Sequence, residues 1–285
     1  MLLASDRIFC ALDTTCTQDA VALATTLNGV VGGVKLGLEF FCANGADGFK
    51  AVAETNMPIF LDLKFHDIPN TVAGAIRAVA PLGPKIITIH TQGGPEMMRR
   101  AAETAAEEAA KHGTAKPWVT GVTILTSMDD ADLSAIGVQD PLTAQVARLA
   151  ALAAQSGLDG MVCSPKEISL ARTATNPDFK LVVPGIRPAG SAVGDQKRVM
   201  TPHDAVSAGA DILVIGRPIT QASNPRAAAD AIAASINGYI NDGLRLFRFK
   251  LHIHPLPLPN HPTVYPSGWL GRGSGLVIHS KPDTL

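Results

Sequence analysis

The segment DLKFHDIPNT at residues 62–71 combines a side chain that can transfer a proton with side chains that keep it charged. Asp62 and Lys64 lie two residues apart at the end of an apolar run, so both side chains should leave a strand on the same face. Asp67 follows after the chain turns. Carboxylates favour the protonated form of a nearby lysine, so Lys64 could protonate a developing carbanion while the carboxylates repel a substrate carboxylate. The alternative is a structural ion-pair network; we favour chemistry, because buried charges are costly to hold without a use.

A second segment, VIGRPIT at residues 214–220, has the composition of a phosphate site. Gly216 ends an apolar run and lets backbone N–H groups come close to an anion, and Arg217 beside it supplies a forked donor. The preceding loop adds PGIRPAG at residues 184–190 and then Gln196. These two segments together predict that a phosphorylated ligand binds where they meet.

Eight apolar, β-rich runs must position these residues. They are IFCALD at 8–13, GVKLG at 33–37, IFLDLK at 59–64, IITIH at 86–90, WVTGVTIL at 118–125, GMVC at 160–163, KLVVPG at 180–185 and DILVIG at 211–216. Most are continuously apolar rather than alternating, which is typical of parallel strands that are covered on both faces.

Helical segments separate these runs. We predict a helix capped by Thr17 and ending near Asn28, one from Pro69 to Val79, one over Met97–His112, one over Pro141–Ser156 and one capped by Asn224 that reaches Ile236. Strict alternation implies a parallel sheet with right-handed crossovers, and eight strands are the number that closes a barrel. A doubly wound open sheet is the alternative. The strand count favours α/β architecture as a single-domain (β/α)8 TIM barrel over residues 1–236.

In such a barrel, function collects at the carboxyl ends of the strands. Polar or charged residues end most of the apolar runs, and all of these ends would meet on one rim. They are Asp13, Lys35, Asp62, Lys64, His90, Thr126, Ser127, Arg187, Gly216 and Arg217. Phosphate sites in barrels often form after the seventh and eighth strands, which is where the segment with Gly216 and Arg217 falls.

Residues 237–285 differ from the rest of the chain. Six prolines fall between Pro255 and Pro282, and a Gly/Ser-rich stretch follows the first five of them. We interpret this segment as an appended C-terminal extension, outside the barrel and of a composition that permits disorder. Its histidines, His252, His254 and His261, lack a neighbouring carboxylate or thiol, so a metal site there is disfavoured.

Composition excludes several classes of protein. Of the 285 residues, 46% are hydrophobic and 17% are charged, which is typical of a globular chain, and a net charge of −1 gives no reason to expect nucleic acid or an acidic membrane as partner. The four cysteines stand far apart, so we expect reduced and mostly buried thiols. Neither a signal peptide nor a long apolar span is visible, so the cytoplasm is the expected location.

Taken in order, the motifs resemble those of the orotidine 5′-phosphate decarboxylase family of the bacterial type. The matching motifs are ALD at 11–13, VKLG at 34–37, DLKFHDIPNT at 62–71, VTILTS at 122–127, PGIR at 184–187, DQKR at 195–198 and IGRPIT at 215–220. DLKFHDIPNT is the most specific of them. The resemblance runs from about Ile8 to Ile236 and leaves the C-terminal extension without a counterpart.

The resemblance implies a reaction and a role for each residue. Lys64 would protonate C6 of the pyrimidine as CO₂ leaves orotidine 5′-phosphate (OMP) to give UMP, without a metal or organic cofactor. Asp62, with Asp67 of the partner subunit in a homodimer, would hold Lys64 and crowd the substrate carboxylate. Substrate-binding residues would be Asp13 and Lys35 at the ribose, Thr71 and Ile68 from across the interface, Thr126 and Ser127 near the pyrimidine, and Gln196, Arg187, Gly216 and Arg217 at the phosphate.

Two alternatives stay open on the sequence alone. One is a sugar-phosphate enzyme on a related barrel, which would share the Asp-x-Lys-x-x-Asp pattern but use Mg²⁺; the segments around residues 66–71, 125–127 and Gln196 favour the nucleotide. The other is a barrel that binds a phosphorylated ligand without catalysis. The intact set of Asp62, Lys64 and Asp67 argues against it, because mere binding does not need that arrangement.

Overall fold

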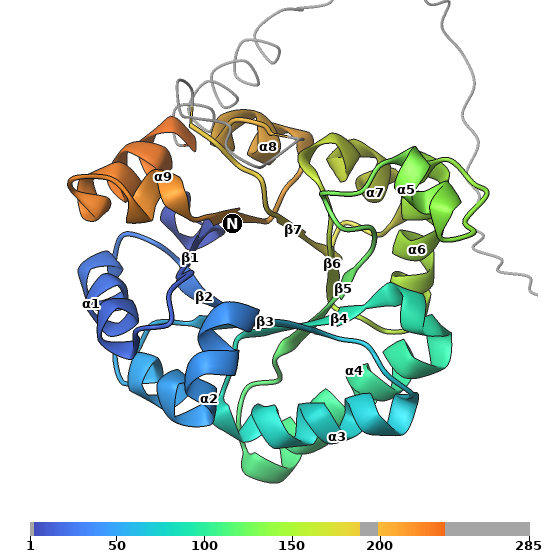
Figure 1. Ribbon diagram of the computed structural model, residues 1–285, viewed down its shortest axis with the longest axis horizontal. Coiled ribbons are helices and arrows are strands. Elements are labelled where there is room, and N and C mark those ends of the chain that lie inside the picture. Colours follow the sequence, from blue (N-terminus) through green and yellow to red (C-terminus); the bar gives the residue numbers. More distant parts are fainter. Residues whose placement is uncertain (1–2, 189–198, 237–285) are drawn as a thin grey trace, which may run out of the picture. The chain divides into compact units, whose positions relative to one another are not determined.

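The computed structural model describes residues 3–188 and 199–236, and within them eight parallel strands close into a barrel (Figure 1). The strands are β1 (Ile8–Ala11), β2 (Gly33–Gly37), β3 (Ile59–Phe65), β4 (Ile86–His90), β5 (Trp118–Val122), β6 (Gly160–Val162), β7 (Lys180–Val183) and β8 (Ile212–Ile215). Each strand pairs with its successor in the sequence, and β8 pairs with β1. The predicted (β/α)8 TIM barrel is confirmed, and the open-sheet alternative is wrong.

Helices surround the barrel (Figure 1). The α-helices are α1 (Thr17–Leu27), α2 (Leu38–Ala53), α3 (Pro69–Val79), α4 (Gly94–His112), α5 (Asp130–Ala135), α6 (Leu142–Gln155), α7 (Ile168–Ala174), α8 (Pro202–Ala208) and α9 (Arg217–Thr220), followed by a helix over residues 225–236. Short 3-10 helices are η1 (Ser5–Arg7), η2 (Ala80–Leu82), η3 (Thr91–Gly93) and η4 (Pro165–Glu167).

Two of the predicted helix caps have different outcomes. Asn224 does cap the last helix, because its Oδ1 accepts a hydrogen bond from the N–H of Ala227 at 3.0 Å. Thr17 is not the cap of α1: it is the first helical residue, and Cys16 precedes it. The Thr17 hydroxyl instead donates to Oδ1 of Asn44 on α2, at 2.8 Å, so it joins two helices rather than ending one.

The alternation of side chains along each strand produces two cores. Inward-facing residues form a small apolar cluster inside the barrel, made up of Phe9, Ala11, Phe60, Ile86, Trp118, Val162, Val182, Ile212 and Val214. Outward-facing residues such as Ile87 and Ile89 pack in the larger core that includes the helices. Since Ile86 faces inward, Thr88 and His90 on the same strand do so too, nearer the carboxyl end. The interior therefore changes from apolar to polar towards that rim.

Some of the predicted features lie elsewhere or outside the described residues. The fifth strand ends at Val122, so Thr126 and Ser127 belong to the turn before α5 and not to a strand. Gln196 and the extension over residues 237–285 fall outside what the structure describes. The four cysteines are free, as predicted, although only Cys10 and Cys163 are fully buried. No helix within residues 3–188 and 199–236 is long and apolar enough to cross a membrane.

Candidate active site

The carboxyl ends of β1, β2 and β3 bring four charged side chains into a line of alternating sign. Strand register places Lys35 opposite Ala11, and Asp62 opposite Gly37. The Lys35 ammonium lies 3.5 Å from Oδ1 of Asp13 and 3.7 Å from Oδ2 of Asp62. The Lys64 ammonium donates to both oxygens of Asp62 at 2.9 Å. The barrel thus holds Asp13, Lys35, Asp62 and Lys64 as one connected network.

The backbone of β3 is distorted at Lys64. Its φ of 51° lies in the left-handed region, which among the described non-glycine residues only Asn56 shares. The pairing of β3 with β4 shifts register between Leu61 and Phe65. The prediction that the Asp62 and Lys64 side chains leave on the same face agrees with their contact, and the strand also carries a bulge there that the alternation did not predict. Strain of this kind persists only where surrounding contacts hold it, and it gathers at functional sites.

The carboxyl group of Asp62 is mostly buried yet stays ionised. Burial on its own would raise its pKa, but Lys35 and Lys64, together with hydrogen bonds from Lys64 and Thr88, hold the pKa below its ordinary value. The Thr88 hydroxyl donates to Oδ1 of Asp62 at 2.9 Å. A carboxylate with two ammonium neighbours and a hydroxyl donor stays ionised at neutral pH, so a negative charge is fixed beside Lys64.

Two glycines leave room for this network. A Cβ atom on Gly37 would lie 2.9 Å from the Lys35 ammonium and 4.0 Å from Oδ1 of Asp13. A Cβ atom on Gly216 would lie 3.4 Å from the side chain of Ala11 and 3.8 Å from Oδ2 of Asp13. A side chain at Gly37 would therefore crowd the Lys35 ammonium, whereas a Cβ atom at Gly216 would make ordinary contacts beside Asp13.

A cavity of about 390 Å³ opens beside the network. It is lined by Ala11, Asp13, Lys35, Pro184, Gly185, Arg187, Val214, Gly216, Arg217, Thr220 and Gln221. Arg187 is buried, with its backbone N–H donating to the carbonyl of Met200 and its Nη1 donating to the carbonyl of Ile186. The lining therefore combines Asp13 and Lys35, which can bind hydroxyls, with two arginines, which can bind a phosphate.

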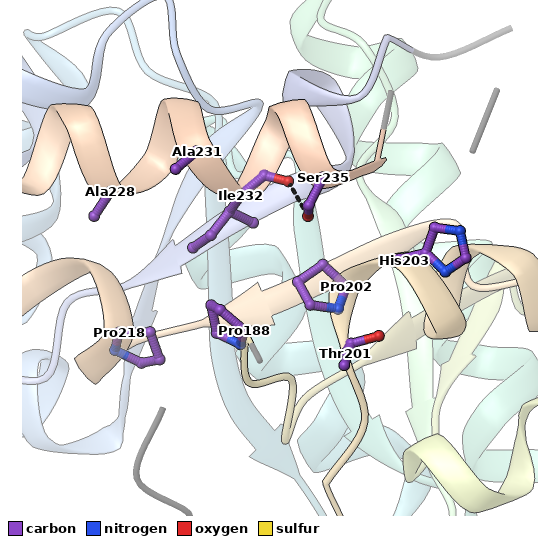
Figure 2. A pocket seen from close by; sticks show the side chains of 9 residues that line it. All are labelled: Pro188, Thr201, Pro202, His203, Pro218, Ala228, Ala231, Ile232 and Ser235. Atoms are coloured by element: carbon purple, nitrogen blue, oxygen red, sulfur yellow. Dashed lines mark hydrogen bonds between the residues drawn. The ribbon is translucent and has the colours of Figure 1, made fainter. Parts of the chain in front are cut away.

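A second cavity, of about 410 Å³, has a described lining without acidic, lysine or arginine side chains (Figure 2). Ala228, Ala231 and Ile232 of the last helix line it together with Pro188, Pro202 and Pro218. The polar groups of that lining are Thr201, His203 and Ser235, and the Ser235 hydroxyl donates to the carbonyl of Ile232 at 2.7 Å. We therefore assign the candidate active site to the cavity at the strand ends.

Several predicted site residues lie away from that cavity. Asp67, Ile68 and Thr71 are exposed on the loop after β3 and the first turn of α3, and Oδ1 of Asp67 accepts a hydrogen bond from the N–H of Ile68. Thr126 is half-buried and Ser127 is exposed, and neither lines the cavity. Within this chain the structure therefore brings together Asp13, Lys35, Asp62, Lys64, Arg187, Gly216 and Arg217 of the predicted set.

Two histidines stand next to Lys64. The rings of His66 and His90 lie 5.3 Å apart. Burial lowers the pKa of His90, and the neighbouring His66 and Lys64 lower it further against the opposing charge of Asp62. His90 is therefore neutral at pH 7, in keeping with packing beside the site. Among the described residues, no group of three His, Cys, Asp or Glu side chains is placed to hold a metal ion.

Sequence reasoning missed Thr88 and Gly37. Thr88 is fully buried within the run IITIH, and the signal that could have revealed it was a hydroxyl at an inward-facing position two residues before His90. Gly37 ends β2 two residues after Lys35, and a glycine at that spacing leaves open the space above the lysine. Both residues serve the charged network by contact, and neither belongs to a motif that stands out by composition.

Comparisons with known proteins agree with this geometry. The model of the orotidine 5′-phosphate decarboxylase / HUMPS family matches residues 6–232. The chain is 54% identical over 229 residues to orotidine 5′-phosphate decarboxylase of Paramagnetospirillum magneticum, covering 80% of this chain and 97% of that relative. It is 54% identical over 233 residues to the same enzyme of Rhodospirillum rubrum, covering 81% and 94%. The crystal structure of orotidine 5′-phosphate decarboxylase from Lactobacillus acidophilus superposes with a TM-score of 0.71 at 37% identity, covering 81% of this chain and 98% of that one.

Proposed function

Because the chain belongs to the orotidine 5′-phosphate decarboxylase / HUMPS family, we propose that its Lys64 ammonium protonates C6 of the pyrimidine as CO₂ leaves OMP. The activity itself is the conversion of OMP to UMP and CO₂ in pyrimidine biosynthesis. The observation that carries the proposal is the Lys64 ammonium held 2.9 Å from both oxygens of an ionised, buried Asp62. A proton donor is thereby fixed in place before any substrate arrives.

The chemistry requires such a fixed donor. When the bond between C6 and the carboxylate breaks, its electron pair stays on C6 as an sp² carbanion with poor delocalisation. A proton from the Lys64 ammonium then forms the C6–H bond of UMP, and solvent returns a proton to the neutral amine. Preorganised charge can stabilise the developing carbanion because it does not reorganise during the reaction. Asp62 contributes by keeping Lys64 charged and by repelling the substrate carboxylate, which loses its charge as CO₂ departs.

The other residues of the cavity would orient the nucleotide. Asp13 and Lys35 would bind the ribose hydroxyls, and Arg187, Gly216 and Arg217 would hold the 5′-phosphate, with Gln196 from the segment outside the described residues. This assignment is supported by the lining of the cavity, which contains both the Asp13–Lys35 pair and two arginines. Binding energy from the remote phosphate can then be used at the reacting carbon.

The exposed residues after β3 suggest a second copy of the chain as partner. Asp67, Ile68 and Thr71 follow Lys64 within seven residues but lie exposed and outside the cavity, and the Ile68 side chain is 66% exposed. We assign them to the active site of the partner subunit in a homodimer, where Asp67 would approach Lys64 and Thr71 the ribose. Thr126 and Ser127 would meet the pyrimidine once the loop before α5 contacts substrate.

The remaining assignments concern the ends of the chain and its location. We propose residues 1–236 as the barrel domain and residues 237–285 as a C-terminal extension. The family match ends at residue 232, and the relative from Paramagnetospirillum magneticum aligns over nearly its whole length with 80% of this chain. We propose the cytoplasm as the location, as expected for an enzyme of pyrimidine biosynthesis.

Loss of OMP absorbance at neutral pH, in buffer with excess EDTA, tests the function directly. We expect rapid conversion to UMP by the unmodified chain and a loss of at least about 10³-fold in kcat for Lys64→Ala. Lys116→Ala is the matched control, because Lys116 also pairs with an aspartate, Asp159, at 2.7 Å, but at the other end of the barrel. Near-normal turnover by Lys64→Ala would remove the assigned role, and no conversion of OMP by the folded, unmodified chain would favour the sugar-phosphate reaction.

A further inference from the structure

We propose that Thr88 is a positioning residue for the decarboxylation: its single buried hydroxyl joins the backbone of Lys64 to the carboxylate of Asp62. This inference rests on the proposed role of Lys64 as the proton donor. Thr88 lies on β4 and faces into the barrel beneath His90, fully excluded from solvent. Its hydroxyl is engaged by the Lys64 N–H and by Asp62, so it would act through these neighbours and not on the substrate.

The hydrogen bonds around Thr88 form a closed ring. The backbone N–H of Lys64 donates to Oγ1 of Thr88 at 2.9 Å. Since a hydroxyl has one proton, and this oxygen accepts from Lys64, that proton is directed to Oδ1 of Asp62, also at 2.9 Å. The Lys64 ammonium donates to the same oxygen of Asp62, again at 2.9 Å. The ring therefore contains both the main chain and the side-chain nitrogen of one lysine.

This ring explains how β3 keeps its strained conformation. The backbone N–H of Lys64 donates to a side chain instead of a strand partner. At the same place the φ of Lys64 is positive, and the register of β3 shifts after Leu61. The Thr88 hydroxyl accepts that N–H and so stabilises the bulge that turns the ammonium toward Asp62. A β-branched residue suits this task, because its χ1 angle is restricted and the hydroxyl stays directed.

A neighbouring threonine separates this role from ordinary barrel packing. Thr120 lies directly opposite Thr88 in the register of β4 and β5, and it too is fully buried. Its hydroxyl donates to the backbone carbonyl of Ile87 at 3.3 Å and contacts none of the charged residues. The two positions share burial, strand environment and residue type. They differ in their link to Lys64 and Asp62.

The test measures kcat and KM for OMP in Thr88→Val, Thr88→Ser and Thr120→Val, each checked for folding by circular dichroism and thermal unfolding. We expect Thr88→Val to lower kcat about 10²-fold with KM changed less than about threefold, because the donor is misplaced while the nucleotide still binds. Thr88→Ser, which keeps the hydroxyl, should recover most of the turnover, and Thr120→Val should stay near the unmodified chain. If Thr88→Val does not fold, Thr88→Cys, with a weak donor of similar size, should show the same loss.

Each outcome separates this inference from the function on which it rests. Unchanged kcat in a folded Thr88→Val, or equal losses in Thr88→Val and Thr120→Val, would overturn the positioning role while leaving Lys64→Ala inactive. Failure of Thr88→Ser to recover turnover would also overturn it, because the hydroxyl would then not be the active feature. Turnover by Lys64→Ala in the same assay would instead remove the proton donor, and Thr88 would have nothing to position.

Discussion

The two sides of the barrel rim hold their candidate residues in different ways. On the side of β1 to β3, Lys35 and Asp62 belong to strands, and strand register alone brings them within 3.7 Å of each other. On the side of β7 and β8, Arg187 and Arg217 follow the strands, and Gln196 lies in a segment outside the described residues. Strand residues are fixed by hydrogen bonds of the sheet, whereas Arg187 in a loop and Arg217 at the start of the four-residue helix α9 depend on contacts further along the chain.

This difference corresponds to a division of labour. Proton transfer needs the donor positioned to within a fraction of an ångström, which favours residues on rigid elements. Phosphate binding tolerates a loop that adjusts to the ligand, and closure of such a loop can follow binding. We therefore expect changes on the β1–β3 side to act on kcat and changes on the β7–β8 side to act on KM. The predictions below test that division.

The largest expected effect concerns the exposed loop after β3. Asp67→Ala should lose at least about 10³-fold in kcat, as should Lys64→Ala, because in the proposed homodimer each removes a charge from the active site. If Asp67 acts in the site of the partner subunit, co-expression of the two inactive chains should give hybrid dimers with one intact site, restoring about a quarter of the activity.

Lys64→Ala combined with Asp62→Ala provides the control for that experiment. Asp62 and Lys64 lie in contact within one chain, so a hybrid of these two variants has no intact site and should stay inactive. Recovery by both mixtures, or by neither, would contradict the assignment of Asp67 to the partner. Differently tagged chains allow the hybrid to be purified and its activity measured alone.

Much of the strand side of the rim could be predicted from the sequence. The runs at residues 33–37 and 86–90 match the observed strands to the residue, because apolar β-rich segments in a parallel barrel are bounded by their own composition. The alternation of side chains then placed Lys35 and Asp62 on the rim. What the sequence did not reveal was the bulge at Lys64, since a positive φ at a lysine is contrary to its own backbone preference and depends on Thr88 from another strand.

Loop residues were predicted less well for a related reason. The apolar run at residues 118–125 suggested a strand reaching Leu125, but the strand ends at Val122, which leaves Thr126 and Ser127 in a turn. Ile124 is buried outside the sheet, so its apolar character reports core packing and not strand extension. Periodicity cannot distinguish these two forms of burial. The prediction for Thr17 was wrong for a different reason, because its hydroxyl bonds to another helix instead of capping its own.

A substitution on the β7–β8 side of the rim should have the next largest effect. We expect Arg217→Ala to raise KM for OMP about 10- to 100-fold, with a smaller change in kcat. A change of that size corresponds to the free energy of one charge-assisted hydrogen bond to phosphate. Arg226→Ala is the control, because Arg226 is an arginine of the last helix whose Nη1 donates only to the carbonyls of Thr26 and Asn28 among the described residues. A loss confined to kcat in Arg217→Ala would contradict the division of labour between the two sides.

The smallest expected effect sharpens the comparison on the strand side. Gly37→Ala adds a Cβ atom 2.9 Å from the Lys35 ammonium, and the flexible end of that side chain can move to relieve the contact. The displaced ammonium would weaken its 3.7 Å contact with Asp62 and so disturb the network from one end. We expect kcat to fall about tenfold or less, with a smaller rise in KM than for Arg217→Ala, because Lys35 also binds the ribose in the proposed site. Gly74→Ala, on α3 with no atom nearer than 3.9 Å, is the matched control. The added methyl group bears no charge, so a fall in kcat specific to Gly37→Ala would mean that turnover depends on where the Lys35 ammonium lies. Equal kcat in Gly37→Ala and Gly74→Ala would show that the network tolerates displacement of that ammonium.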